Sequence, residues 1–155
     1  MDIQDRLILN LLQKEGRCSY AVIGKQVGLS VTAIKDRIDK LQNAGILKNF
    51  SIDVDECKIG YSVLGFISVA IDRPEDCPVF EQAMQTLPQV QECHHITGGF
   101  NYLIKVVAKD MAALEELLST RIKLAGIVGR TETAIVFSSP KKTSFVDCLL
   151  EGAQK

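Results

Sequence analysis

The spacing of hydrophobic residues changes near residue 55, and this change limits the fold of the chain more than any other feature. Up to that point apolar residues recur every three or four positions, as they do on the buried face of a helix. Beyond it, apolar runs rich in β-branched residues, typical of strands, alternate with further helical stretches. We therefore predict domains at residues 1–53 and 61–140, a linker at 54–60 and a C-terminal tail at 141–155.

The formal charge changes sign at the same place. Residues 2–50 hold eight Lys and Arg against five Asp and Glu, a net charge of +3. Residues 51–155 hold ten against fourteen, a net charge of −4. A basic segment favours contact with a polyanion, because its cations pair with phosphates and release counterions. The nearly neutral chain thus contains one basic domain.

Three helices are predicted in the first domain, at residues 3–15, 20–27 and 31–44. Ser19 and Ser30 can cap the second and third helices, and Gly28 permits the sharp turn between them. The side chains expected to face a common core are Ile3, Leu7, Ile8, Leu11, Leu12, Val22, Ile23, Val27, Leu29, Ile34, Ile38 and Leu41. Residues 46–52 alternate in polarity and predict a short strand, which would form the wing of a winged helix.

Two helices joined by a short turn that contains glycine are the layout of a helix-turn-helix. In that motif the start of the second helix enters the DNA major groove, and basic residues meet phosphates or guanine. The residues predicted to contact DNA are Arg17, Ser30, Val31, Thr32, Lys35, Asp36, Arg37 and Lys40. The alternative is a three-helix core with solvated charges. The turn, the basic excess and the strand together favour double-stranded DNA as a partner.

The second domain has the order strand, helix, strand, strand, helix, strand. The strands are predicted at residues 61–71, 90–97, 100–108 and 127–138, and the helices at residues 79–87 and 110–124. This βαββαβ order is that of a ferredoxin-like sheet. The predicted fold class is therefore α+β: an N-terminal winged helix-turn-helix followed by a ferredoxin-like βαββαβ domain.

Both faces of the first strand in that sheet are apolar. Successive side chains of a strand point to opposite sides. One side carries Val63, Ile67, Val69 and Ile71, and the other carries Leu64, Phe66 and Ala70. Two helices can cover only one face, so the other would remain as a large apolar patch. We expect a homodimer that joins the bare faces, which would also present two recognition helices to a two-fold symmetric DNA site.

Several motifs together resemble the Lrp/AsnC family of prokaryotic regulators, also called feast/famine regulatory proteins. The motifs are DRLILNLL at 5–12, Gly16-Arg17, VGLSVTAIKDRIDKLQNAGIL at 27–47, QECHHITGGFNYLIKV at 91–106 and GRTETAIVF at 129–137. The likeness covers about residues 2–140. It implies dimers that assemble into octamers or higher rings, and an amino acid that binds between dimers and changes assembly or DNA affinity.

The resemblance also implies an effector site. The family's Gly-x-x-Asp-Tyr loop falls on residues 98–102, and its paired threonines fall in the last strand. The implied effector residues are Gly98, Gly99, Asn101, Tyr102, Thr131 and Thr133. Asn101 replaces the family's Asp and offers an ammonium group only a neutral oxygen. We therefore expect either a weaker, altered or absent pocket or a role for Asn101 in the turn. Val31 likewise replaces a proline common at that helix start.

Other chemistries find little support in the sequence. Neighbouring side chains of a strand face opposite sides, so Cys93 and His95 share a face that His94 does not, and no further ligand has a fitting spacing. No phosphate loop or catalytic triad motif is present. We expect no metal, no cofactor and no enzymatic activity.

Two alternatives to a regulator stay open. Some proteins of this architecture are siroheme decarboxylases, whose site needs basic residues and a histidine that faces a large pocket. The other alternative is an assembly partner that has lost DNA binding and modulates a paralogue. The sequence has no apolar run of membrane-spanning length, no signal-peptide pattern and no C-x-x-C among its five cysteines. We therefore expect a cytoplasmic protein with reduced thiols and no membrane partner.

Overall fold

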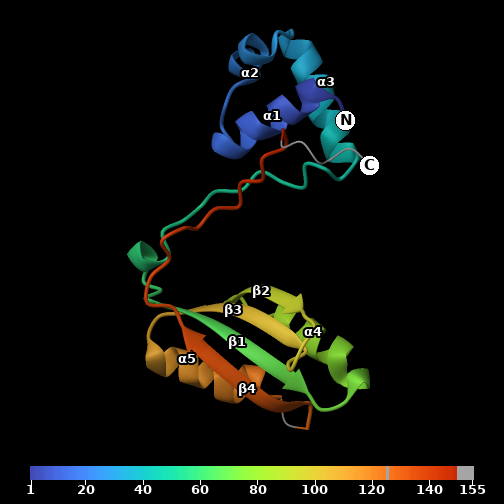
Figure 1. The fold of residues 1–155 in the computed structure, drawn as a ribbon. Helices are drawn as coiled ribbons and strands as arrows, with labels where there is room; N and C mark the ends of the chain where they lie inside the picture. The colour runs from blue at the N-terminus through green and yellow to red at the C-terminus, as the bar shows by residue number, and fades with distance from the viewer. Residues whose placement is uncertain (125, 150–155) are drawn as a thin grey trace. The chain divides into compact units, whose positions relative to one another are not determined.

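The computed structural model describes residues 1–124 and 126–149, which form two compact units (Figure 1). The first unit combines Met1–Val54 with the segment that begins at Lys141, and the second unit is Asp55–Pro140. The second unit is therefore an insertion between two parts of the first. The segment after Lys141, expected as a separate tail, packs with the helical unit. No helix in the described part of the chain has the length and apolarity needed to cross a membrane.

Three helices build the first unit: α1 (Ile3–Lys14), α2 (Tyr20–Val27) and α3 (Val31–Asn43). Asp2 and Asp5 form a capping box at the start of α1. The Ser19 and Ser30 hydroxyls accept hydrogen bonds from the amides of the first turns of α2 and α3, as predicted. Gly28 follows α2 with a φ of 76°, a left-handed conformation that glycine adopts without strain. Local chemistry thus sets both ends of the turn between α2 and α3.

The core of the first unit is small. Its buried cluster consists of Ile8, Leu12, Ile23, Ile34 and Ile38, all of them predicted core residues. The prediction was wrong for Ile3 and Val22, which are exposed. Ile3 is the first residue of α1, and Val22 lies about 100° around α2 from buried Ile23, because each residue of an α-helix rotates by that angle.

No strand forms at residues 46–52 in the described part of the chain, so the predicted wing strand is not present. The amides of Ile46 and Leu47 instead donate to the Leu41 carbonyl and complete the end of α3. The chain then runs without regular secondary structure (Figure 1). Phe50 and Ile52 are exposed there. A strand needs a neighbour to bond its amides and carbonyls, and alternating polarity alone does not supply that neighbour.

A four-stranded antiparallel sheet and two helices build the second unit (Figure 1). The strands are β1 (Val63–Ile71), β2 (Val90–His95), β3 (Tyr102–Ala108) and β4 (Val128–Ile135), in the order β2-β3-β1-β4. The helices are α4 (Cys77–Gln85) and α5 (Met111–Leu117), with a π-helical turn η3 (Leu118–Ile122) and short 3-10 turns η1 (Cys57–Ile59) and η2 (Pro74–Asp76). The α+β class and the βαββαβ order are confirmed, with strands somewhat shorter than predicted.

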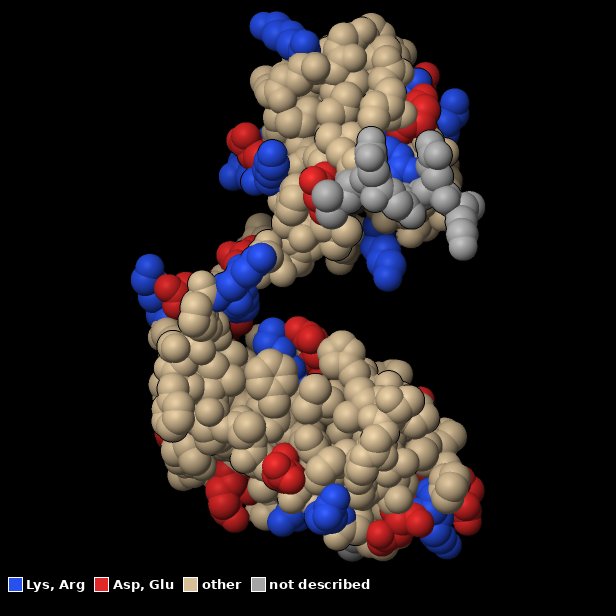
Figure 2. Space-filling view, viewed as in Figure 1, with Lys and Arg blue, Asp and Glu red and all other residues tan. Residues whose placement is uncertain are grey.

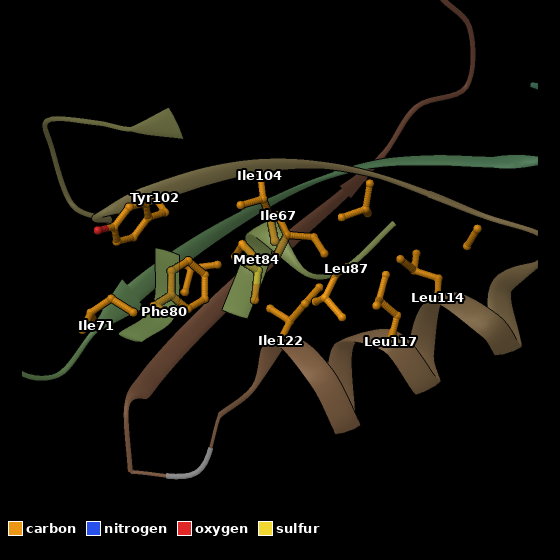
Figure 3. Close-up of a cluster of buried hydrophobic side chains, with 13 residues drawn as sticks. Ile67, Ile71, Phe80, Met84, Leu87, Tyr102, Ile104, Leu114, Leu117 and Ile122 are labelled. Carbon is orange, nitrogen blue, oxygen red and sulfur yellow. The ribbon is translucent and has the colours of Figure 1, made fainter. Parts of the chain in front are cut away.

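The core of the second unit lies between the sheet and its helices (Figure 3). The sheet contributes Ile67, Val69, Ile71, Tyr102, Ile104 and Val106, and the helical segments contribute Phe80, Met84, Leu114, Leu117 and Ile122. On the other face of β1, Leu64, Phe66 and Ala70 are only half-buried. The two-sided pattern predicted for β1 is therefore observed, with one side packed by helices and the other open.

Candidate DNA interface and effector loop

The start of α3 is exposed and regular. Ser30 caps the helix through a hydrogen bond of 3.2 Å from the Ala33 amide to its hydroxyl, so α3 begins in a defined orientation. The side chains of Thr32, Lys35 and Asp36 are exposed on the side of α3 away from Ile34 and Ile38. The other predicted DNA contacts that are exposed are Arg17, Ser30, Val31 and Lys40. The structure thus leaves a polar face of α3 exposed, as insertion into a DNA groove requires.

Arg37 differs from the other predicted DNA contacts. Its guanidinium Nη1 lies 2.7 Å from carboxylate oxygens of both Asp2 and Asp5, and Nη2 donates to the Gln4 side chain at 2.9 Å. The two carboxylates raise the pKa of Arg37, and the bonds from the Asp5 amide and Arg37 lower the pKa of Asp2. Arg37 therefore joins α3 to the start of α1, and two carboxylates compensate its positive charge.

Charges of both signs cover the first unit. Figure 2 shows its Lys and Arg side chains interspersed with Asp and Glu on the visible face, with no single large basic patch. With Arg37 neutralised by acidic neighbours, Lys35, Lys40 and Arg17 are the exposed cations among the predicted contacts. Phosphate contact from a few cations positions a helix on DNA, while polar side chains at its start read the bases.

The loop between β2 and β3 is bonded to the end of β1 through Asn101. The Asn101 side-chain oxygen accepts a hydrogen bond of 2.8 Å from the Ile71 amide. Its backbone amide donates to Val69 at 2.9 Å, and its carbonyl accepts from Ile96 at 2.8 Å. Gly98 has a φ of 119°, which only glycine adopts readily. The Asn101 side chain therefore holds the turn, a task that needs an acceptor oxygen and no charge.

Tyr102 follows the loop and is buried in the core. Its hydroxyl donates to Glu81 of α4 at 2.7 Å, and its ring stacks on the His95 ring with a centroid distance of 4.8 Å. The Phe80 ring packs against it at a centroid distance of 4.9 Å with the planes tilted by 42° (Figure 3). Burial, followed by the bond to Glu81, raises the pKa of Tyr102. The tyrosine fixes the start of β3 against α4.

The paired threonines of β4 lie on one face of the sheet, as the alternation predicts. Thr131 pairs with Val69 and Thr133 with Ile67, so both point to the side that carries the core. Since Asn101 bonds to Val69 from the β3 side, Thr131 and the β2–β3 loop meet at the same end of β1. Thr133 lies two residues further along the edge strand and is exposed.

Two further residues at this end had no signal in the sequence. The Arg130 guanidinium lies 4.4 Å from the centroid of the Phe100 ring and donates to the Gly99 carbonyl at 3.5 Å. On the same strand, a Cβ at Gly129 would overlap the Asp72 carboxylate, so Asp72 packs directly against this glycine. The pairing of β1 with β4 brings Arg130 and Asp72 to the end of β1 where the β2–β3 loop is bonded. Residues that meet only through strand pairing have no recognisable spacing in the sequence.

The arrangement defines a class: a helix-turn-helix protein whose second motif helix has an exposed start, joined to a sheet domain whose β2–β3 loop is hydrogen-bonded to β1. The matching family models are a winged helix-turn-helix DNA-binding domain at residues 1–48 and the Lrp/AsnC ligand-binding domain at residues 64–146. The leucine-responsive regulatory protein of Escherichia coli K12 is 35% identical over 147 residues, which cover 93% of this chain and 89% of that protein.

Solved structures agree with this classification. Escherichia coli AsnC is 32% identical, with a TM-score of 0.87 over 94% of this chain and 97% of that one. An AsnC family regulator from Agrobacterium tumefaciens is 28% identical, with a TM-score of 0.87 over 97% and 100% of the two chains. The chain belongs to the Lrp/AsnC family and is a DNA-binding transcription regulator with a ligand-binding domain.

Proposed function

We propose that this regulator binds DNA as a homodimer and responds to an amino acid or a related small molecule at the β2–β3 loop, in the cytoplasm. The exposed and capped start of α3 is the observation that carries the DNA-binding part. Ser30, Val31, Thr32 and Asp36 would face base edges, whereas Lys35, Lys40 and Arg17 would meet phosphates or guanine. Arg37 would act indirectly by holding α3 on α1.

The test of the DNA interface starts from a duplex selected in vitro from a random pool by the wild-type chain. Thr32→Ala and Lys35→Ala should each weaken retention of that duplex in a gel shift by about tenfold, since one good base contact contributes about 1–3 kcal/mol. Gln26→Ala, an exposed substitution on α2, serves as the control for a general surface effect. Unchanged retention by both α3 variants would contradict the assigned recognition helix and favour an assembly partner without DNA binding.

The open face of the sheet supports the homodimer. Leu64, Phe66 and Ala70 of β1 lie on it beside Leu103 and Val107 of β3. Lys105 of β3 lies directly opposite Phe66 and is paired there with Glu92 of β2. In the ligand-binding unit Figure 2 shows a broad uncharged surface with most charged side chains near its borders. A largely apolar face whose charged side chains are paired or lie near its edges is compatible with a protein interface. A second copy, joined by the same face, would cover it and would extend to octamers by further contacts.

The homodimer is tested by light scattering at micromolar concentration. The wild type should have at least twice the chain mass of 17.1 kDa. Leu64→Glu, opposite Val107, should lower the mass by placing an unpaired charge among apolar side chains. Val79→Glu on the exposed side of α4 is the matched control and should leave the mass unchanged. A monomeric wild type would contradict this part of the proposal.

For the effector, the charges at the end of the sheet support an amino acid. Arg130 can pair with a carboxylate, and Asp72 can pair with an ammonium group, a role that Asn101 cannot fill. Asn101 keeps the loop in place because its oxygen accepts from the Ile71 amide. Gly98 and Gly99 would expose backbone groups to the ligand. Thr131 and Thr133 point to the face of β4 opposite Arg130 and would reach the ligand from the core side of this edge strand. Tyr102 would support the loop from the core.

Thermal unfolding with each of the twenty amino acids tests the effector. A ligand at a hundredfold excess over its Kd stabilises the folded state by about 2.7 kcal/mol. A selective shift in the wild type that is lost in Asp72→Asn and in Arg130→Gln would support this site. A shift only in Asn101→Asp would mean that the asparagine has silenced the amino-acid site. No shift in any variant would contradict an amino-acid effector and leave the DNA-binding result untouched.

A further inference from the structure

Helix α1 carries a row of polar side chains on the side away from the core. Arg6, Asn10 and Gln13 follow one another at intervals of four and three residues, so they lie on one helix face. Asn10 lies about 180° around the helix from the core side chains Ile8 and Leu12, yet it is only 9% exposed. Something other than the helical core therefore covers this face.

The cover is the C-terminal segment of the same chain, residues 145–149, here named the latch. Gln13 bonds to Val146 twice: its Nε2 donates to the carbonyl at 2.8 Å, and its Oε1 accepts from the amide at 2.8 Å. The Asn10 oxygen accepts from the Cys148 amide at 2.9 Å, and Arg6 donates to the Cys148 carbonyl at 2.7 Å. The latch is thus held mainly through its backbone.

Two side-chain contacts fix the register of the latch on α1. Asn10 Nδ2 donates to the Asp147 carboxylate at 2.8 Å, and that carboxylate also accepts from the Leu149 amide at 2.9 Å. Lys14 lies over the ring of Phe145, with its ammonium nitrogen 5.8 Å from the centroid. A one-residue slip would move both side chains away from these partners, so this segment fits the row in one position.

The latch is bound by interactions that water can replace. Hydrogen bonds between partly exposed groups contribute little net free energy, because each group also bonds to water when released. Ordering an extended segment costs conformational entropy at every residue. Both effects favour release, and segments of this kind open without unfolding the rest of the protein.

The chain connects the two units twice, so docking of the latch affects how the helical unit is attached. The chain leaves the first unit after Val54, forms the ligand-binding unit and returns at Lys141. We propose that residues 145–149 are a releasable latch. When the latch is docked on α1, the DNA-binding helices are attached to the ligand-binding unit twice, through the chain after Val54 and through the docked C-terminal segment. When the latch is released, only the chain after Val54 attaches them. Two attachments restrict the orientations of the helices, whereas one flexible linker leaves them free.

Thiol labelling of the full chain with N-ethylmaleimide, resolved by peptide mass spectrometry, tests the docking. Cys148 is half-buried on α1 and Cys57 is exposed, so Cys57 is an internal reference. In the wild type Cys148 should react about fivefold more slowly than Cys57, and in Asn10→Ala/Gln13→Ala the two rates should become equal. Gln26→Ala should keep the wild-type rates. Equal rates in the wild type, or slow labelling that persists in the double variant, would overturn docking through this row.

Amide relaxation measured by NMR on the same full-length variants tests the attachment. If the docked latch restrains the helices, the rotational correlation time reported by amides of α1, α2 and α3 should be shorter in Asn10→Ala/Gln13→Ala than in the wild type. The correlation time reported by amides of the sheet should stay unchanged. A chain that ends at Thr143 should match the double variant. Faster Cys148 labelling without faster motion of the helices would overturn the role in attachment, because the latch would then be only a local cover of α1.

Discussion

The two units of this regulator are stabilised in different ways. Among its described residues, the helical unit buries a cluster of five side chains, and the starts of its helices are set by caps within three residues in the sequence. The described part of the sheet unit buries thirteen side chains in its cluster, and β1 pairs with strands that follow it by tens of residues. Elements with local signals can thus form a unit with a small core, whereas the sheet depends on long-range pairing and a large core.

Phe80→Ala should have the largest effect and should act on the sheet unit. Phe80 of α4 is fully buried against the Tyr102 ring, and truncating such a side chain costs about 3–5 kcal/mol. Chemical denaturation of the full chain should show an earlier transition for the sheet unit, with the helical unit unchanged. Val79→Ala, at an exposed position next to it, should have little effect. A single transition shared by both units would show that they do not unfold independently.

Ile34→Ala tests the small core of the helical unit. The expected loss of stability is similar to that of Phe80→Ala or slightly smaller. Ile34 is fully buried in α3, and an Ile→Ala substitution costs about 2–5 kcal/mol. Because the helical unit has so few buried side chains, we expect this loss to unfold it at temperatures where the sheet unit remains folded. Circular dichroism should detect the early loss of helix, and Val31→Ala on the exposed face should not produce it.

Gly24→Ala tests the turn of the helix-turn-helix. A Cβ at Gly24 would lie 2.6 Å from the Leu29 carbonyl oxygen, so α2 and the turn would have to separate. Overpacking of this kind costs about 1–3 kcal/mol. We expect weaker binding to the selected duplex than the loss of stability alone explains. Gly16→Ala, where the nearest atom lies at an ordinary 3.8 Å, is the control and should retain DNA binding.

Acid should weaken the helical unit slightly through Asp2. The bonds from the Asp5 amide and Arg37 lower the pKa of Asp2 in the folded state. A lowered folded pKa means that the stabilisation is present above the ordinary pKa of Asp and is lost as the pH falls through the folded value. Asp2→Asn should therefore reduce the loss of helical stability between neutral and strongly acidic pH. Asp39→Asn, on the exposed face of α3, should leave the pH profile unchanged.

The candidate site shows the same division between local and distant information. Ser30 and the exposed start of α3 could be predicted, because a helix cap and a helical stripe depend on neighbours in the sequence. The involvement of Arg37 with Asp2 and Asp5 was not predicted, since these residues meet only when α3 packs on α1. Asn101 was correctly considered as a turn residue, but its partner, the Ile71 amide, is thirty positions away.

The sequence by itself determined the order of the elements, the caps of the three helices and the two-sided character of β1, because these follow from residue types and short intervals. Tertiary structure decided that residues 46–52 form no strand within this chain, that Tyr102 is buried against Glu81 and that Arg130 lies over Phe100. It also decided that the C-terminal segment binds α1. The reason is physical: a hydrogen bond or ion pair between distant residues depends on where the backbone brings them, and no local preference encodes that distance.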